Sequence, residues 1–331
     1  MGGEQFVFLG GHRKCGTTMF LNLFDHNEHC CVFPTDIAVL YGYFPVYTAG
    51  DFTTAQRLDR LDRVIFGVSL SRLRDKHKLG DRLPVERIRE HFFAHLNQDA
   101  LTRIDAIIRQ IIDSYRAVMA LPVEQAPIVV IKETSLEIYA QMLAEMFPRA
   151  KFIQVVRDPR DNYAALYAGI EKHYRLFDEN ENHILASLLH RVGLGMRLIE
   201  PNMQALGSDH FMMLSFEELA QNPDDSMNKV AAFLGIPFTT DLLRPSILGQ
   251  PTSGNNYDDQ QFFAVTARNV GRWRERISDR EAQVIEFHLG DIMEQFGYSR
   301  TFPRDVSARA AAEFYRWSNY RYFFKDSFAV M

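Results

Sequence analysis

Cysteine is scarce in this chain, which excludes a fold held together by a framework of disulfide bonds. The 331 residues contain three cysteines: Cys15, Cys30 and Cys31. Two of them are adjacent, and neighbouring cysteines rarely pair with each other. A chain without a disulfide framework is typical of a reducing compartment. We therefore predict a cytoplasmic location, and the first apolar run starts at Phe6, which leaves no room for a signal peptide.

Long apolar runs and an excess of basic residues are also lacking. No uninterrupted stretch approaches the roughly 18 apolar residues that a membrane-spanning helix needs. The formal net charge is -5, which argues against a dedicated nucleic-acid-binding protein. What remains is an ordinary globular composition, with 47% hydrophobic and 24% charged residues. The chain is long enough for one large α/β core.

Short apolar runs, rich in Val, Ile or Phe and bounded by polar residues, predict buried strands. They are Phe6–Leu9, Cys31–Phe33, Ile128–Ile131, Phe152–Val156 and Phe211–Leu214. Helical periodicity separates most of these runs, which favours βαβ units. Continuous apolar strands fit a sheet that is covered on both faces. The sequence therefore predicts an α/β fold with a central parallel sheet of about five strands.

The rest of the chain is mostly helical in pattern, and we interpret it as part of one domain. A charge-rich helical insertion over residues 53–120 separates the second and third strands. Further helices are predicted at 183–206, at 223–235 with Gly235 as the C-terminal cap, and at 279–296. Residues 249–270 are predicted to be a loop. The aromatic and basic tail, 305–331, is predicted to pack on the body of the protein or on a partner subunit in a homo-oligomer.

The segment FVFLGGHRKCGTTMFLNLF has the pattern of a phosphate-binding loop between a strand and a helix. Backbone N–H groups and the helix dipole at such a junction face an anion. Thr17 and Thr18 add hydroxyl donors, and Arg13 and Lys14 add positive charge. The spacing from Gly11 to Gly16 matches the nucleotide triphosphatase pattern, in which a lysine directly follows the second glycine. In this sequence Thr17 directly follows Gly16, and the lysine is Lys14, two residues before that glycine.

Two other predicted strands also end in a cation. In IVVIKET the predicted strand is followed by Lys132, and in FIQVVRDPRD the predicted strand is followed by Arg157. Ligands of open parallel sheets bind outside the carboxyl ends of the strands, so Lys14, Lys132 and Arg157 should converge there. Their mutual repulsion favours a multiply anionic ligand between them. A triphosphatase needs a strand that ends in Asp to hold magnesium, and none of the predicted strands does, so we expect no metal.

These motifs together resemble those of the sulfotransferases that use 3′-phosphoadenosine-5′-phosphosulfate (PAPS). HRKCGTT is similar to the 5′-phosphosulfate loop of that family, with Cys15 in place of a small hydroxyl residue. FIQVVRDPRDNYAALY resembles the 3′-phosphate motif. FMMLSFEELAQNPDDSMNKVAAFLGIPF resembles a downstream strand–helix segment, and VGRWRERIS resembles the basic loop before the last helix. The matches keep the family order and run from residue 6 to about 297.

The resemblance implies a P-loop-NTPase-like fold, PAPS as the cofactor and a role for each matching residue. Lys14 would stabilise charge on the leaving phosphate, and Lys132 would lie near the sulfonate. The remaining loop residues Arg13, Cys15, Gly16, Thr17 and Thr18 would surround the 5′-phosphate. Arg157, with Arg268, Gly271 and Arg272 of the late basic loop, would bind the 3′-phosphate. A purely structural alternative for Arg157 is an ion pair with Asp158 or Asp161.

The sequence departs from the family pattern in two places. Ala165 stands where the 3′-phosphate motif usually has a serine, so one hydroxyl donor is missing. The usual catalytic base is also absent: Glu133 follows the third strand where a histidine is common, and Asp36 is the nearest acid after the second strand. We favour Asp36 as the base and rank Glu133 second, because a carboxylate beside lysines would stay ionised. The alternative for Asp36 is the N-cap of a helix.

The sequence therefore predicts a PAPS-dependent sulfotransferase. It would transfer a sulfonate group by in-line displacement to a hydroxyl, or less readily an amine, of a small-molecule, lipid or carbohydrate acceptor. The insertion would shape the acceptor site. Two other functions stay open: a nucleotide or small-molecule kinase of the P-loop type, and a non-catalytic nucleotide-binding protein.

Overall fold

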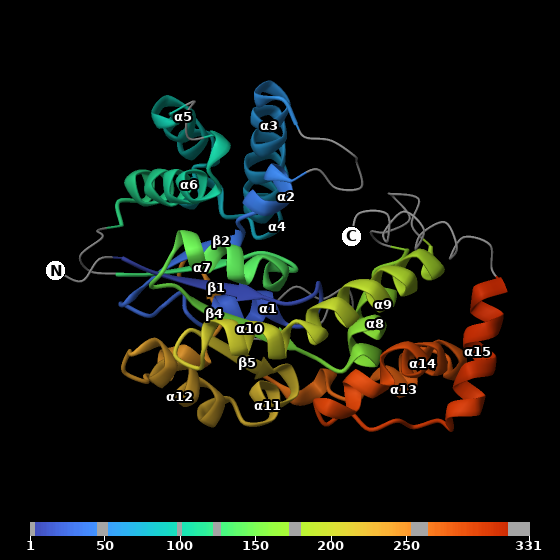
Figure 1. The fold of residues 1–331 in the computed structure, drawn as a ribbon. Helices are drawn as coiled ribbons and strands as arrows, with labels where there is room; N and C mark the ends of the chain where they lie inside the picture. The colour runs from blue at the N-terminus through green and yellow to red at the C-terminus, as the bar shows by residue number, and fades with distance from the viewer. Residues whose placement is uncertain are drawn as a thin grey trace.

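The computed structural model describes residues 4–44, 52–97, 101–121, 127–171, 180–252 and 264–316. Its centre is a sheet of five parallel strands in the order β2-β3-β1-β4-β5 (Figure 1). The strands are β1 (Gln5–Gly10), β2 (Cys30–Asp36), β3 (Ile128–Lys132), β4 (Lys151–Val156) and β5 (Phe211–Ser215). Each contains a predicted run and extends at least one residue beyond it. The predicted α/β fold with a parallel sheet is confirmed.

Both faces of the sheet are covered, and this explains why the strands are apolar throughout. Phe6 and Phe8 of β1 belong to the larger hydrophobic cluster, whereas Val7 and Leu9 belong to a second one. Successive side chains of a strand point to opposite faces, so each face of β1 packs against its own layer. All four side chains are at most 2% exposed. A fully buried strand therefore has no polar face to reveal its period of two.

The predicted insertion between β2 and β3 is mostly helical over its described residues. Figure 1 shows its helices rising from one side of the sheet. Within 53–120 they are α3 (Thr54–Leu61), the π-helix η1 (Asp62–Leu70), α4 (Ser71–Lys76), the 3₁₀ turn η2 (Gly80–Arg82), α5 (Val85–His95) and α6 (Ile104–Met119), and α2 (Val39–Tyr43) precedes them. Tyr115 of α6 contacts Phe33 of β2 edge to face, with 5.4 Å between ring centroids. The insertion thus shares its core with the sheet.

The other crossovers carry the helices that cover the sheet. They are α1 (Thr17–Asn22), η4 (Leu136–Tyr139), α7 (Ala140–Met146), α8 (Pro159–Tyr167), α9 (Glu181–Arg197), α10 (Ile199–Leu206), α11 (Phe216–Gln221) and α12 (Pro223–Leu234). The prediction of one helix over 183–206 was wrong, since α9 and α10 meet at Leu198. Pro201 lies in the first turn of α10, and its missing N–H interrupts a continuous helix. Gly235 caps α12 as predicted, with φ 74°.

After α12 the chain returns to the carboxyl edge, the edge at which the parallel strands end. This part contains η6 (Thr240–Leu243), a hairpin of β6 (Ser246–Ile247) and β7 (Gln250–Pro251), η7 (Ala267–Asn269), α13 (Trp273–Arg276), α14 (Asp279–Gln295) and α15 (Arg304–Arg316). The predicted loop at 249–270 thus includes part of a hairpin, and its residues 253–263 lie outside the described ranges. Residues 317–331 of the predicted tail also lie outside the described ranges, whereas its first part, 305–316, belongs to α15.

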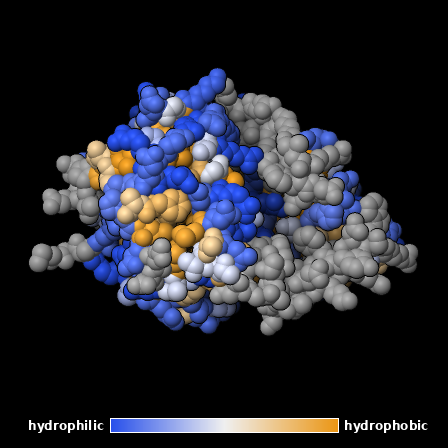
Figure 2. Space-filling view, turned by 90° about the horizontal axis from the view of Figure 1, so that it is seen from above, coloured by the Kyte–Doolittle hydropathy of each residue, from blue (hydrophilic) through white to orange (hydrophobic). Residues whose placement is uncertain are grey.

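Viewed from the side of the insertion, the described surface is mostly hydrophilic, with a hydrophobic area near its middle and smaller hydrophobic spots around it (Figure 2). Over the described ranges, no helix is both long enough and apolar enough to cross a membrane.

Candidate active site

The phosphate loop (residues 11–16) connects β1 to α1 at the carboxyl edge. Lys14 has φ 67°, in the left-handed region, and Gly16 has φ 101°. A Cβ atom on Gly16 would lie 2.4 Å from Cδ2 of Phe216, so the ring of Phe216 leaves no space for a side chain. Gly11 has φ 135°, and a Cβ there would lie 2.6 Å from the carbonyl oxygen of Val155. Both glycines are therefore required by the backbone conformation and by packing.

Three side chains from other elements hold the phosphate loop from behind. The Oε2 atom of Glu137 accepts a hydrogen bond of 2.8 Å from the Gly11 amide. The side-chain amide of Asn162 donates to the Arg13 carbonyl at 2.8 Å, and Nη1 of Arg157 donates to the Lys14 carbonyl at 2.9 Å. The loop is thus attached to η4, to α8 and to the end of β4. This attachment stabilises the strained conformation of Lys14.

Arg157 is buried, and its two terminal nitrogens bind backbone carbonyls of two separate loops. Besides the Lys14 carbonyl, it donates at 2.7 Å to the carbonyl of Asn269. Its guanidinium lies over the ring of Phe216, 4.4 Å from the centroid. The predicted alternative, an ion pair with Asp158 or Asp161, is wrong, since Arg157 has no ion pair within the described ranges. Burial lowers the pKa of Arg157. The charges of Asp161, Glu217 and Asp158 oppose this shift without forming an ion pair, and an anionic ligand in direct contact would stabilise the guanidinium further.

Asp161, in the first turn of α8, fixes the late loop (residues 264–272). Its carboxylate accepts hydrogen bonds from the amides of Gly271, at 2.6 Å, and Trp273, at 2.8 Å. Asp158 has a different role, because it pairs with Arg160 at 2.7 Å and caps α8. Arg160 is buried and also pairs with Glu286 of α14 at 2.6 Å. These contacts join β4 and α8 to the C-terminal helices.

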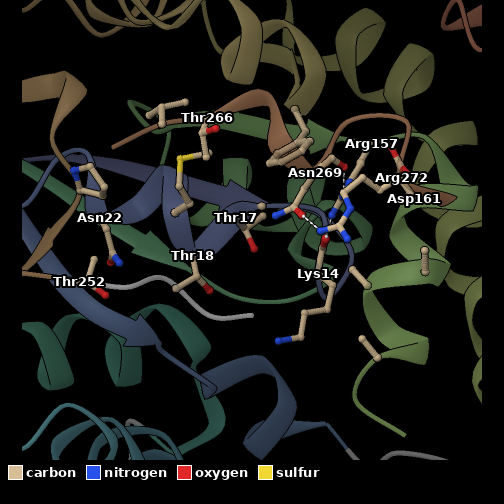
Figure 3. Close-up of a pocket in the computed structure, with 18 of the residues that line it drawn as sticks. Lys14, Thr17, Thr18, Asn22, Arg157, Asp161, Thr252, Thr266, Asn269 and Arg272 are labelled. Atoms are coloured by element: carbon tan, nitrogen blue, oxygen red, sulfur yellow. Dashed lines mark hydrogen bonds between the residues drawn. The ribbon is translucent and has the colours of Figure 1, made fainter. Parts of the chain in front are cut away.

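A pocket, which we call the nucleotide pocket, opens between the phosphate loop, α8 and the late loop (Figure 3). Its predicted members are Lys14, Gly16, Thr17, Thr18, Arg157 and Arg272. Figure 3 shows the Lys14 side chain extending away from Arg157 and Arg272. Ala165 lines the pocket too, so the position without the usual hydroxyl does lie at the site. Asn269 and Arg276 also line it, and the sequence prediction missed both.

Other predicted cofactor residues lie elsewhere. The thiol of Cys15 is buried, and Cys15 lines a second cavity behind the loop instead of the nucleotide pocket. Burial raises its pKa to about 12, so it is a neutral thiol. Arg13 does not line the nucleotide pocket. Its carbonyl accepts a hydrogen bond from Asn162, and its Nη2 donates to the Ser187 hydroxyl at 3.4 Å. Arg268 is exposed on the late loop, and Gly271 contributes its amide to Asp161.

The ammonium group of Lys14 is in an unusually positive and desolvated environment. Its pKa falls from an ordinary 10.5 to about 7. Burial is the largest cause, followed by the charges of Lys76, Lys132, Arg72 and Arg13. Lys76 and Arg72 belong to α4, so the insertion contributes to the electrostatics of the phosphate loop. An anion bound near Lys14 would favour its charged form.

Asp36 and Lys132 form an ion pair of 2.7 Å at the ends of β2 and β3. Oδ1 of Asp36 also accepts a hydrogen bond from the Thr134 amide at 3.1 Å. Asp36 is the last residue of β2, and the N-cap of the following helix is Ala38, so the helix-cap alternative is wrong. The Asp36 side chain is 37% exposed, whereas that of Lys132 is 3% exposed. Asp36 is therefore both held in place and accessible.

Glu133 is close to this pair in the chain but differs in its surroundings. It is buried, and its two oxygens accept from the amides of Leu40, at 3.1 Å, and Tyr41, at 2.7 Å. These bonds attach α2 to the end of β3. Burial raises its pKa to about 8. Both carboxylate oxygens are thus occupied by backbone donors.

Sequence reasoning missed the residues that orient others rather than face a ligand. Asp161 could have been found, because it follows Arg157 by one helical turn within RDPRD. Glu137, Asn162 and Phe216 have no local signal, since their roles depend on contacts with residues far away in the chain. No cluster of three or more potential metal-binding His, Cys, Asp or Glu side chains occurs within the described ranges.

Comparisons with known proteins agree with this geometry. A model of the sulfotransferase family matches residues 7–240. An omega-hydroxy-beta-dihydromenaquinone-9 sulfotransferase of Mycobacterium tuberculosis is 21% identical over 207 residues, which cover 60% of this chain and 48% of that protein. A putative protein-tyrosine sulfotransferase of Caenorhabditis elegans is 22% identical over 206 residues, or 60% of this chain and 76% of that protein. This chain thus spans about half the length of the mycobacterial relative.

Two solved structures share the fold over nearly the whole chain. The sulfotransferase domain from the curacin biosynthetic pathway superposes with a TM-score of 0.57 at 15% identity, covering 90% of this chain and 99% of that one. The sulfotransferase domain of the Synechococcus PCC 7002 olefin synthase gives a TM-score of 0.51 at 19% identity, with 91% and 97% covered. The family model covers the phosphate loop, Asp36, Lys132 and Arg157 in one continuous match, and the chain belongs to the sulfotransferase family.

Proposed function

We propose that this protein transfers the sulfonate group of PAPS to a hydroxyl, less readily to an amine, of a small-molecule, lipid or carbohydrate acceptor. The observation that carries the proposal is the buried Arg157 at the nucleotide pocket. No carboxylate forms an ion pair with it within the described ranges, and the nearby charges of Asp161, Glu217 and Asp158 only partly offset the cost of its burial. A 3′-phosphate in the nucleotide pocket would supply the missing negative charge. ATP and its simpler relatives lack this group.

The residues of the nucleotide pocket fit PAPS in charge and in donor type. Arg157 and Arg272 would hold the 3′-phosphate, with Arg276 as an additional cation that offsets the hydroxyl absent at Ala165. The amides that begin α1, with the hydroxyls of Thr17 and Thr18, would hold the 5′-phosphate. When bound, PAPS supplies a sulfonate group on a phosphate leaving group.

Lys14 and Asp36 would then have separate roles in the in-line displacement, at the leaving group and at the acceptor. A new bond forms between sulfur and the acceptor oxygen while the bond between sulfur and the 5′-phosphate oxygen breaks, and the electron pair stays on the phosphate. Lys14 would stabilise the charge on that leaving oxygen. Asp36 would accept the proton of the acceptor hydroxyl, and Lys132 and Thr134 hold its carboxylate in place. Glu133 is the weaker candidate, because its oxygens are occupied by two backbone amides.

The acceptor remains a class rather than a compound. The two relatives named above act, by their names, on a hydroxylated menaquinone and on protein tyrosine, and both acceptors offer a hydroxyl group. The insertion would shape the acceptor site, because α2 begins just after Asp36 and is bonded to Glu133. All three cysteines are buried and free, in keeping with the predicted reducing compartment.

Calorimetric titration with 3′-phosphoadenosine-5′-phosphate (PAP), the product of PAPS, tests the proposal against a kinase. We expect PAP to bind at least tenfold more tightly than ATP with magnesium, a difference of about 1.4 kcal/mol. A preference for ATP and magnesium would overturn the PAPS assignment. Transfer of labelled sulfonate from PAPS to a panel of hydroxyl acceptors would then separate an enzyme from a binding protein.

A further inference from the structure

A small cavity lies directly behind the phosphate loop, on the other side of Arg157 from the nucleotide pocket. We call it the rear cavity, and its volume is about 20 Å³. The polar side chains that line it belong to His12, Glu137, Gln154, Arg157 and Asn162. Arg157 lines both spaces and so forms part of the wall between them.

The rear cavity is surrounded by polar atoms without partners. His12 is 5% exposed, and neither of its ring nitrogens has a hydrogen-bond partner within the described ranges. The same holds for Oε1 of Gln154 and Nε of Arg157. Gln154 is oriented by its other amide atom, which donates to the Gly195 carbonyl at 2.7 Å. Unpaired buried polar atoms are rare in proteins, because each has lost its hydrogen bonds to water without a replacement.

One ordered water would pair most of these atoms. An ordered water needs roughly 10–15 Å³ of cavity volume and two to four polar partners. The rear cavity, with its volume of about 20 Å³ and its unpaired polar atoms, meets both conditions. Burial and the charges of Arg13 and Arg191 lower the pKa of His12 well below its ordinary value, so the imidazole is neutral. A neutral imidazole has one acceptor nitrogen. A water can accept from the Arg157 Nε–H and donate both to this nitrogen and to Oε1 of Gln154.

We propose that His12 is a positioning residue for Arg157, acting with Gln154 through an ordered water in the rear cavity. The two terminal nitrogens of Arg157 are fixed by the Lys14 and Asn269 carbonyls, and the water fixes the third, Nε. The guanidinium plane is then held at three points and presents its remaining N–H groups to the nucleotide pocket. The inference rests on the proposed function, because it assigns Arg157 to the 3′-phosphate.

The consequence is specific to one part of the ligand. Adenosine 5′-monophosphate (AMP) shares the adenosine and 5′-phosphate groups of PAP but lacks the 3′-phosphate. Loss of His12 should therefore weaken the binding of PAP and leave the binding of AMP unchanged. A merely structural role of His12 would change both affinities together, because general loosening of the loop also affects the 5′-phosphate.

The test compares two variants of the full-length protein by calorimetric titration with PAP and AMP. His12→Phe keeps a planar ring but removes both nitrogens. Met196→Leu, on the apolar wall of the same cavity, is the matched control because it removes no hydrogen-bonding atom. We expect His12→Phe to reduce the ratio of PAP to AMP affinity by about tenfold, the scale of one weakened bond to a charged group. Met196→Leu should leave the ratio unchanged.

Two further variants keep the test decisive. Gln154→Met removes another hydrogen-bond partner of the water, so we expect the same loss in the ratio of PAP to AMP affinity. This variant provides the test if His12→Phe does not fold. In an Arg157→Lys background, which lacks Nε, His12→Phe should have no additional effect. An unchanged ratio of PAP to AMP affinity in His12→Phe or Gln154→Met would overturn this inference but not the proposed function. Equal binding of PAP and AMP by the unaltered protein would instead overturn the proposed function.

Discussion

At the scale of single residues, Lys14 combines a left-handed backbone with a partly desolvated charge. A lysine with φ 67° is uncommon, and here the conformation is held by the hydrogen bond from Arg157 to its carbonyl. The same position surrounds its ammonium with other cations. Both features cost free energy in the unliganded protein. Both become useful when an anion binds, since strain and unbalanced charge often mark functional sites.

Removal of the Lys14 ammonium should abolish sulfonate transfer without unfolding the protein. We expect Lys14→Ala to lower kcat by about 10²–10³-fold or more, because a charge that stabilises the leaving phosphate is lost. Steady-state transfer assays and thermal melts provide the measurement. Lys78→Ala is the matched control, since Lys78 also has positive φ, 52°, and is exposed. Full activity in Lys14→Ala would contradict the assigned role.

Binding of PAP should be accompanied by proton uptake above neutral pH. With a pKa of about 7, Lys14 is largely neutral at pH 8 in the free protein. A bound anion favours the charged form, so the affinity for PAP should fall as pH rises above 7. Calorimetry at pH 8 in two buffers of different ionisation enthalpy measures the uptake. The Lys14→Arg variant, whose side chain stays charged, should bind PAP without proton uptake. Equal proton uptake by the variant and the unaltered protein would show that Lys14 is not the group that takes up the proton.

The two candidate bases should respond differently to amide substitution. Asp36→Asn should lower kcat by about 10²–10⁴-fold with little change in PAP affinity, because it removes the proton acceptor. Glu133→Gln should lower kcat less, because Glu133 is buried with both oxygens bonded to backbone amides, although the variant leaves one of those amides without its acceptor. Transfer assays of the two variants side by side give the answer. The reverse ranking would make Glu133 the base.

Residue types and spacing predicted the residues that line the nucleotide pocket better than the residues that support them. Lys14, Gly16, Thr17, Thr18 and Arg157 could be assigned because their roles are local to a strand–loop–helix junction. The direction of a side chain was less predictable: Cys15 points behind the loop, and Arg268 is exposed. These directions depend on positive φ angles and on neighbours such as Phe216, which no local pattern encodes.

At the scale of elements, the start of α8 organises the late half of the site. Pro159 begins this helix, and the Asp158 side chain caps it by accepting from the Arg160 amide. Asp161 then bonds two amides of the late loop and α13. One short stretch of sequence, RDPRD, thus supplies a cation for the pocket, a helix cap, a buried ion pair and an anchor for a distant loop.

Loss of the Asp161 carboxylate should release the late loop. We expect Asp161→Ala to weaken PAP binding by about tenfold or more, since two buried amides lose their acceptor and Arg272 loses its support. AMP binding should change less. Calorimetric titration measures both affinities. Asp225→Ala, which removes an exposed carboxylate from the first turn of α12, should behave like the unaltered protein. Normal PAP affinity in Asp161→Ala would show that the loop is held by other contacts.

The elements themselves were largely predictable, and their ends were not. Apolar runs located every strand of the sheet because fully buried strands are hydrophobic on both faces. The division of 183–206 at Leu198 was missed, since the apolar pattern continues across it. The hairpin at Ser246–Ile247 and Gln250–Pro251 was also missed, because such short strands leave no periodic signal. The side chain of Asp25 accepts bonds from Ser246, Leu248 and Gly249 there.

At the scale of the whole molecule, the site is assembled from both ends of the described chain. Arg157 lies between the phosphate loop and the late loop and donates to a carbonyl in each. A ligand that bridges these loops should therefore stabilise the molecule as a unit. The insertion adds charges from α4 to the surroundings of Lys14, so a change in the insertion should also affect the electrostatics of the phosphate loop.

PAP should raise the thermal stability of the protein in a concentration-dependent manner. At a free concentration of 100 times Kd, the free energy of unfolding should increase by about 2.7 kcal/mol. Thermal melts over a PAP dilution series measure the shift. Adenosine, without phosphates, serves as the control and should have little effect at the same concentrations. An equal shift with adenosine would mean that the phosphate-binding residues contribute nothing to ligand binding.

The double hydrogen bond of Arg157 has a consequence for how the protein is made. Synthesis proceeds from the N-terminus, so the Lys14 carbonyl exists long before the Asn269 carbonyl emerges from the ribosome. Until then Arg157 has only one of its two loop partners, and the nucleotide pocket has no late wall. The sheet can form earlier, because its last strand ends at Ser215. A growing chain would therefore be able to complete its sheet before it can bind nucleotide, because the late loop is synthesised after β5.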